Sequence, residues 1–436
     1  MEEYKKILAE YIKFKSISTD KKFLPEIYSC VKFLNELFKK NGLKTKIIEN
    51  YNNPLVYGEY NANKKETVLI YGHYDVQPAK KEDGWKNDPF VLYEDKKRFY
   101  GRGTADNKGQ TLIHLYTTFK LLRENNLGYN IKIILEGNEE TGSDKLEKFL
   151  RDYRGLLKSN FVLISDGEIV KNIPIIDAGF RGVINLELEV KTANKDFHSG
   201  LYGGVLPNAL HEMIKILSTF FDKEDKILIK GFYEKIEKID KEIIKLNKKL
   251  PFDEKKFKKE TKVKKFFTKD LDFYTKTGLW ATIQLTGLSG GYFGEGFKNA
   301  IPHSSLAKIN IRFVEKQNAK EIVKKIKNHL KRIVPSYVDY NLKVKEIAPA
   351  VKLDLNNSYT KKAKEVLKKV FKKEPVFKFS GGGLPVVFYF KNILKVPQVL
   401  VPLANEDCNM HSVNENFSKN LIQKGLEFSY LFLKNG

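Results

Sequence analysis

Histidine and carboxylate side chains recur in this sequence directly after predicted strands. His73 and Asp75 follow the apolar run Val68–Tyr71, which has the length of a buried strand. Alternate side chains of an extended backbone leave the same face, so this imidazole and this carboxylate point together beyond the strand's carboxyl end. A carboxylate beside a histidine is typical of a metal ligand whose tautomer is fixed by its partner. For this one pair alone, a strand that ends in a polar turn is the more common explanation.

Further acidic residues occupy the same kind of position. Asp106 lies in a glycine-rich turn ahead of a helix predicted over 109–124, where it is either an N-cap or a ligand. Glu139 and Glu140 follow one predicted strand, and Asp166 follows the next. The β-α-β-α-β order predicts a parallel sheet, in which these strand ends meet at one edge. So many carboxylates in one place require a cation.

The elements around these residues predict two domains, one inserted into the other. A chain of 436 residues exceeds what one hydrophobic core usually supports. The strand–helix alternation of residues 1–181 resumes in 349–436, and we expect these two parts to form one α/β domain around a mainly parallel sheet. Residues 182–348 follow the β-α-β-β-α-β order of a ferredoxin-like α+β arrangement. A Lys-rich stretch at about 222–278 interrupts this order and is predicted to be helical.

Composition argues against several other classes of protein. The net charge of +24 could indicate nucleic-acid binding, but only eight of the 78 basic residues are Arg, which phosphate and base readout favour. No apolar run reaches the roughly 20 residues that span a bilayer. The two isolated cysteines do not form a disulfide framework. We therefore expect a soluble cytoplasmic protein with no membrane partner and no specific nucleic-acid partner.

Five segments together resemble a known enzyme family. They are, in chain order, GHYDVQP, GRGTADNKG, EGNEETG, SDG and NMHSVNE, the last of which contains His411. The chain is similar to the co-catalytic di-metal peptidases and deacylases, which include carnosinase, cytosolic non-specific dipeptidase, glutamate carboxypeptidase, aminoacylase and succinyl-diaminopimelate desuccinylase. The segments HSGLYGG and GGYFGEGFKNAIP, with the large insertion, most resemble the carnosinase and dipeptidase branch.

This resemblance implies a zinc-exopeptidase-like catalytic domain that holds two divalent ions, with Zn²⁺ favoured and Mn²⁺ or Co²⁺ as substitutes. In the implied site Glu139 is the general base for a hydroxide that bridges the ions, and Asp75 orients His73. A cis peptide bond between Asp106 and Asn107 is also implied. The implied ligand sets share one residue: His73, Asp106 and Asp166 for one ion, and Asp106, Glu140 and His411 for the other.

The resemblance makes the inserted domain a lid and a dimerisation domain. His198 would reach the active site of the other subunit of a homodimer and hydrogen-bond the developing oxyanion. Asn299 and Arg312 would contact the substrate, and a guanidinium is suited to clamp a carboxylate. Backbone N–H groups of Gly382 and Gly383 would face the same carboxylate. The nearest relatives usually have Ser in place of Gly383, which leaves the substrate preference open.

The predicted function is metal-dependent hydrolysis of the amide bond of dipeptides or short peptides that have a free carboxylate. An N-acyl-amino-acid deacylase of the aminoacylase or desuccinylase type uses the same machinery and is the nearest alternative. A non-catalytic binding protein that retains the fold is the third, and Glu139 argues against it, because such a protein has little need of a base beside its metals. We interpret Arg181 as a hinge residue and Cys408 as a packing residue.

Overall fold

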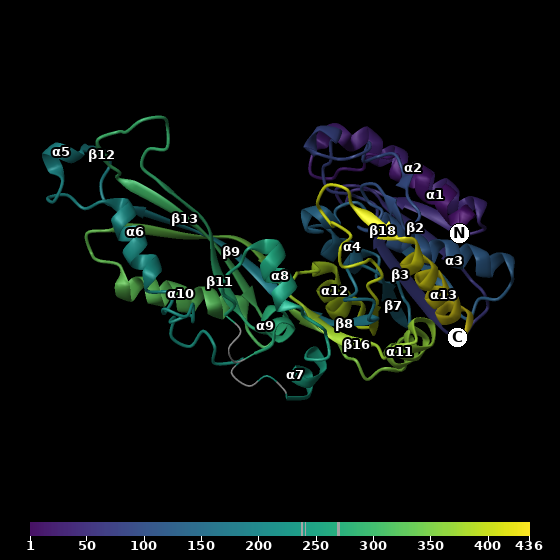
Figure 1. Cartoon of the computed structure of the whole chain (residues 1–436). Coiled ribbons are helices and arrows are strands. Elements are labelled where there is room, and N and C mark those ends of the chain that lie inside the picture. The colour runs from purple at the N-terminus through teal and green to yellow at the C-terminus, as the bar shows by residue number, and fades with distance from the viewer. Residues whose placement is uncertain (237–238, 240, 268–270) are drawn as a thin grey trace.

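The larger of two lobes is built on a six-stranded sheet (Figure 1). The computed structural model describes residues 1–236, 239, 241–267 and 271–436. In spatial order the strands of this sheet are β1 (Lys44–Ile48), β2 (Leu55–Tyr60), β6 (Asn130–Glu136), β3 (Thr67–His73), β7 (Phe161–Ile164) and β17 (Gln398–Leu400). β3 pairs in parallel with β6 and β7, and β7 with β17, whereas β1 and β2 form an antiparallel edge. The predicted α/β class with a mostly parallel central sheet is confirmed.

Helices cover both faces of this sheet, because side chains of β3 alternate between two cores. Val68 and Ile70 lie in one hydrophobic cluster, and Leu69 and Tyr71 lie in another. The first cluster is closed by α1 (Glu2–Ile12), α2 (Leu24–Lys40), α3 (Lys108–Arg123), α11 (Ser358–Phe371) and α13 (Lys419–Lys434). The second is closed by α4 (Leu146–Asp152) and α12 (Pro385–Tyr389). Burial on both faces explains why β3 and β7 contain continuous apolar runs.

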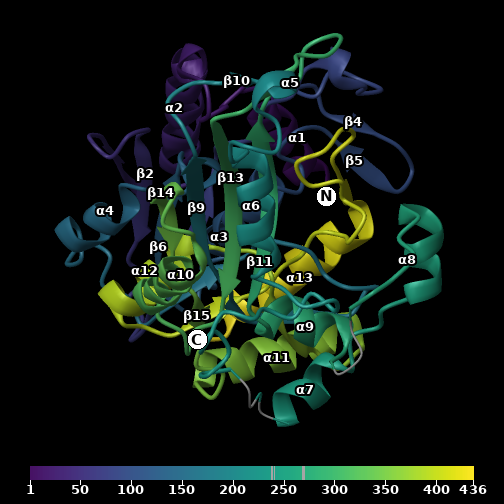
Figure 2. The same cartoon turned by 90° about the vertical axis from the view of Figure 1, so that its left-hand side faces the viewer.

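The second lobe contains a four-stranded antiparallel sheet with its own hydrophobic core. Its strands lie in the order β11 (Thr282–Gly290), β13 (Ser304–Phe313), β9 (Gly182–Lys191) and β14 (Asp339–Ala348). Two helices, α6 (Ala209–Ser218) and α10 (Ala319–Ile333), lie against one face of this sheet (Figure 2). Along the chain the order is β9-α6-β11-β13-α10-β14.

Three short helices follow α6 within the Lys-rich stretch: α7 (Lys241–Asn247), α8 (Glu254–Thr261) and α9 (Phe273–Leu279). The stretch predicted to be helical, about 222–278, also includes 237–238, 240 and 268–270, which lie outside the described residues. The described part of the stretch is therefore helical in short pieces separated by turns. Among the described helices, none combines the length and the apolar character that crossing a bilayer requires.

The lobes are joined through a small sheet that the sequence analysis did not predict. It consists of β15 (Val351–Lys352), β8 (Ile175–Phe180) and β16 (Val376–Ser380), in that order. The chain leaves the larger lobe from β8 into β9 and returns from β14 into β15. In the larger lobe, α4 ends at Asp152, three residues ahead of Gly155, a residue type that disfavours a helix interior.

Candidate metal centre

The carboxyl ends of the parallel strands bring the predicted ligands together. β3 ends at His73, and β7 leads into Asp166. After β6, a short 3-10 helix (Glu139–Thr141) carries Glu140. Within each of two groups, the candidate ligand atoms lie within 4.8 Å of one another. One group is His73, Asp106 and Asp166, and the other is Asp106, Glu140 and His411.

Asp106 lies between the two groups and presents one carboxylate oxygen to each. Its Oδ1 lies 3.1 Å from Nε2 of His73, and its Oδ2 lies 2.8 Å from Nε2 of His411. Asp166 Oδ2 and Glu140 Oε2 complete the groups at 3.6 Å and 3.2 Å from the same two nitrogens. Nε2 of His73 is buried and has no hydrogen-bond partner among the described residues. Donors arranged in this way fit a pair of cations with one shared carboxylate.

The loop before α3 excludes the other interpretation of Asp106. The N-cap position of α3 is Asn107, and the Asp106 carboxylate faces the two imidazoles instead of the helix terminus. The Asp106–Asn107 peptide bond is cis, as the family resemblance implies. The Asn107 side chain donates a 2.8 Å hydrogen bond to the carbonyl oxygen of Ser165, next to Asp166. The loop therefore connects two of the candidate ligands directly.

Glu415 was missed as a site residue, although it belongs to the same segment as His411. This fully buried carboxylate accepts hydrogen bonds from the backbone N–H groups of Gly103, Ala105 and Asp106 at 2.8–3.1 Å. It also pairs with the Arg102 guanidinium at 2.7 Å. The only signal in the sequence was its position four residues after His411. Nothing in a single sequence distinguishes a buried glutamate of this kind from an exposed one.

Asp75 connects the ends of β3 and β6. Its carboxylate lies 3.3 Å from Nδ1 of His73, which also hydrogen-bonds the backbone oxygen of Asp75 at 3.1 Å. The same buried carboxylate accepts the backbone N–H groups of Glu139 and Glu140 at 3.3 and 3.1 Å. Gln77 adds a 2.8 Å hydrogen bond to Glu140 Oε2. One side chain thus holds both the imidazole and the acidic turn in place.

The concentrated negative charge controls protonation in the centre. Hydrogen bonds to Asp106 and Glu140 raise the pKa of His411 to about 10. Burial lowers the pKa of His73, but the surrounding carboxylates more than offset this and raise it well above its usual value. Burial, with nearby carboxylates, raises the pKa of Glu139 well above its usual range. The cluster therefore attracts positive charge, which protons or a metal ion can supply.

Glu139 lies beside the centre but belongs to neither ligand group. Its Oε2 is 3.9 Å from Nε2 of His73, and its side chain keeps 17% of its surface exposed. A carboxylate that is close to the candidate metals, free of them and partly open to solvent can exchange protons with a reacting molecule.

The predicted substrate-binding residues fall into two places. A Cβ atom at Gly383 would lie 3.8 Å from Nη1 of Arg312, so Arg312 lies beside the glycine loop 381–383. The neighbouring Arg181 donates hydrogen bonds to the backbone oxygens of Trp280 and Gly381 at 3.0 and 3.3 Å. These bonds hold the loop against the second lobe.

His198 and Asn299 lie elsewhere, and both are exposed. His198 ends β10 (Phe197–His198), which pairs with β12 (Ala300–Ile301), and Asn299 directly precedes β12. β12 and α5 (Ser199–Tyr202) occupy the end of the second lobe that is remote from the larger lobe (Figure 1). The fold of one chain therefore does not bring these two residues to the candidate metal centre.

Comparisons with known proteins agree with this geometry. The sequence model described as Peptidase family M20/M25/M40 matches residues 69–435. The human Beta-Ala-His dipeptidase is 31% identical over 392 residues, covering 87% of this chain and 77% of that protein. The Cys-Gly metallodipeptidase of Schizosaccharomyces pombe is 28% identical over 463 residues, covering 98% and 94%. The crystal structure of an M20 family metallo-carboxypeptidase from Sulfolobus solfataricus aligns with a TM-score of 0.88 at 30% identity, covering 100% of this chain and 99% of that one.

Proposed function

The chain belongs to peptidase family M20/M25/M40, and from this premise we propose that it hydrolyses the amide bond of dipeptides or short peptides that have a free carboxylate. Its similarity to Beta-Ala-His and Cys-Gly dipeptidases makes it a metallodipeptidase. The observation that carries the proposal is the position of Asp106, whose two oxygens face two separate groups of imidazole and carboxylate donors.

The donor chemistry fits two divalent ions. Imidazole nitrogens and carboxylate oxygens, without thiolates, suit Zn²⁺ in a catalytic site and also accept Mn²⁺ or Co²⁺. His73 and Asp166 would hold one ion, Glu140 and His411 the other, and Asp106 both. When bound, such ions polarise a carbonyl oxygen and lower the pKa of water towards neutrality.

The protein's own groups complete the reaction. Glu139 takes a proton from the attacking water and gives it to the leaving amine, for which its position beside His73, outside both ligand groups, is suitable. Asp75 holds His73 and the backbone of Glu139 in register for this step. Arg312 and the backbone N–H groups of Gly382 and Gly383 bind the substrate carboxylate.

We also propose that the protein acts as a homodimer in which the second lobe is the lid. Leu201 lies in α5, which follows His198 directly, Val205 follows α5, and Phe297 precedes β12; the relative exposures of these side chains are 73%, 79% and 101%. Exposed apolar side chains gathered in one place mark an interaction surface. In a dimer His198 would reach the partner's centre and donate a hydrogen bond to the developing oxyanion. Localisation in the cytoplasm and the lack of a specific nucleic-acid partner stay predictions.

Mixed dimers test the contribution of His198 from a second copy. His198→Ala and Glu139→Gln proteins should each be inactive, because every site lacks one group. When the two are mixed and allowed to exchange, half of the dimers contain one intact site, so about a quarter of the wild-type activity should return. No recovery between proteins that demonstrably exchange subunits would contradict the proposed role of His198.

A substrate panel tests the function itself. The metal-loaded protein should hydrolyse dipeptides faster than the matched N-acyl amino acids, and a chelator should abolish both activities. Faster hydrolysis of N-acyl amino acids would support the deacylase alternative. The Glu139→Gln protein should retain both ions but lose about 10²–10⁴-fold in turnover. Absence of turnover on every substrate, with two ions bound, would favour the non-catalytic alternative.

A further inference from the structure

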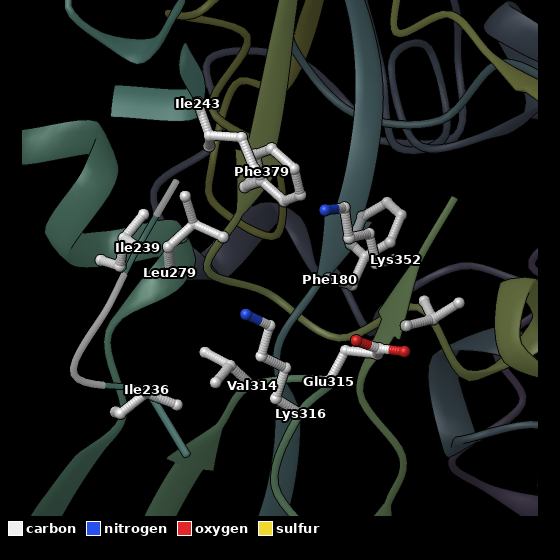
Figure 3. A pocket seen from close by; sticks show the side chains of 12 residues that line it. Phe180, Ile236, Ile239, Ile243, Leu279, Val314, Glu315, Lys316, Lys352 and Phe379 are labelled. Atoms are coloured by element: carbon white, nitrogen blue, oxygen red, sulfur yellow. The ribbon is translucent and has the colours of Figure 1, made fainter. Parts of the chain in front are cut away.

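A cavity of about 160 Å³ lies where the two lobes meet (Figure 3). The larger lobe contributes Phe180 of β8, Lys352 of β15 and Phe379 of β16 to its wall. The second lobe contributes Leu279 of α9 and the segment 314–316 that follows β13. None of the predicted site residues lines this cavity.

The walls define the size and polarity of an occupant. The rings of Phe180 and Phe379 face the aliphatic side chains of Leu279 and Val314 (Figure 3). An apolar cavity of roughly 150 Å³ accommodates a molecule the size of benzene. The space therefore fits a single ring or a branched aliphatic group, and it is too small for a folded peptide segment.

Two cations add a specific chemical requirement. The side chains of Lys316 and Lys352 extend into the space between the apolar walls (Figure 3). Among the described residues, no carboxylate lies within ion-pair distance of either ammonium group. Glu315 also lines the cavity, but it pairs with neither lysine. An apolar pocket with a few convergent polar groups is typical of a small-molecule site. Two ammonium groups against the one carboxylate of Glu315 favour an anionic ligand.

We propose that this cavity, the hinge cavity, binds a small carboxylate that has an aromatic or branched apolar group. The apolar group would lie between Phe180, Phe379 and Leu279, and the carboxylate would lie between the ammonium groups of Lys316 and Lys352.

Such a ligand would act on the position of the lobes, because its contacts come from both. A ligand shifts a conformational equilibrium by its difference in affinity for the two arrangements. Phe180 directly precedes Arg181, and Phe379 lies two residues before Gly381 at the start of the glycine loop. Occupation of the hinge cavity would therefore change the support of the loop that is proposed to bind the substrate carboxylate. This effect on turnover rests on the proposed function, whereas binding does not.

Binding can be measured with 3-phenylpropanoate as the probe and the full-length, metal-loaded protein, by calorimetry or ligand-detected NMR. The neutral amide of the same shape should bind at least about tenfold more weakly, because it lacks the charge-assisted contacts. Lys316→Met and Lys352→Met should each cause a similar loss. Lys327→Met, which removes an exposed lysine of α10 outside the cavity, should cause none.

Several outcomes would overturn the proposal. These are equal binding of the amide, wild-type affinity in both lysine variants, and loss of binding in Arg312→Met, which would place the probe in the substrate site.

Leu279→Trp, which fills the cavity, should abolish binding, and a thermal unfolding transition should show that this variant is still folded. Small-angle X-ray scattering should show a different lobe arrangement with the probe in wild type but not in Leu279→Trp. Bound probe without such a difference would refute the coupling to the hinge. Because these measurements need no turnover, their failure is distinct from failure of the proposed function.

Discussion

Replacement of Glu415 by Ala is expected to weaken both the fold and metal binding. The carboxylate is fully buried and holds the loop that presents Asp106 through three backbone N–H groups. It also neutralises Arg102, which is 3% exposed and lies over the Trp85 ring. Because Glu415 follows His411 in the same loop, it ties two candidate ligands from distant parts of the chain together.

The size of the effect follows from these contacts. Removal of one partner of a buried ion pair leaves an uncompensated charge and costs about 3–5 kcal/mol. Here the stranded group is the Arg102 guanidinium, and three buried N–H groups lose their acceptor as well. Loss of a group that positions a metal ligand typically lowers metal affinity about 10–100-fold. We expect both effects in Glu415→Ala.

Urea unfolding and metal titration against a competing chelator measure these two quantities. Glu406→Ala is the matched control, because Glu406 lies nine residues before Glu415 in the chain, is exposed and accepts a hydrogen bond from the backbone N–H of Lys171. The double variant Arg102→Leu/Glu415→Leu should recover part of the lost stability, since neither charge is then stranded. A Glu415→Ala protein as stable as the Glu406→Ala control, with unchanged metal affinity, would refute this reasoning.

Three further predictions concern protonation and the substrate pocket. Burial lowers the pKa of His114 from 6.5 to about 3, so the neutral ring contributes fully to stability above pH 6.5 and this contribution is lost as the pH falls towards 3. Between these pH values the free energy of unfolding should fall less in His114→Gln than in wild type, and the difference should be at most about 5 kcal/mol. Carboxylates raise the pKa of His411 to about 10, so a metal ion that binds this imidazole displaces a proton. Calorimetry between pH 6 and 9 should therefore show the apparent metal affinity rising about tenfold per pH unit for each proton released. Gly383→Ser should leave stability unchanged, because a Cβ at this position lies 3.6 Å or more from its neighbours. Since the new side chain lies beside Arg312, it should change KM for substrates with a free carboxylate more than it changes kcat.

The centre of the larger lobe was predictable because its strands carry their own signals. The run from Val68 to Tyr71 is apolar throughout, and both faces of β3 are buried. The polar residues follow each strand directly, so the parallel arrangement alone brings His73, Glu140 and Asp166 to one edge.

The remaining features depend on partners that are remote in sequence. β8, β15 and β16 are assembled from segments up to about 200 residues apart, and β8 contains Asp177 and Gly179, which weaken a strand signal. His114 appears as an ordinary helical residue, yet its ring contacts the hydroxyl groups of Ser165 and Ser429. The N–H groups that Glu415 accepts come from a loop about 310 residues earlier. Periodicity and residue type cannot reveal such contacts, because they arise only from tertiary packing.

Metal stoichiometry in wild type and in Asp106→Ala tests the central claim most directly. Equilibrium dialysis followed by elemental analysis should find two divalent ions per wild-type chain, because Asp106 offers one oxygen to each ligand group. Asp106→Ala should lose high-affinity binding of both ions while keeping the circular dichroism of the wild type. Retention of two tightly bound ions by Asp106→Ala would show that this carboxylate does not join the two groups and would contradict the proposed centre.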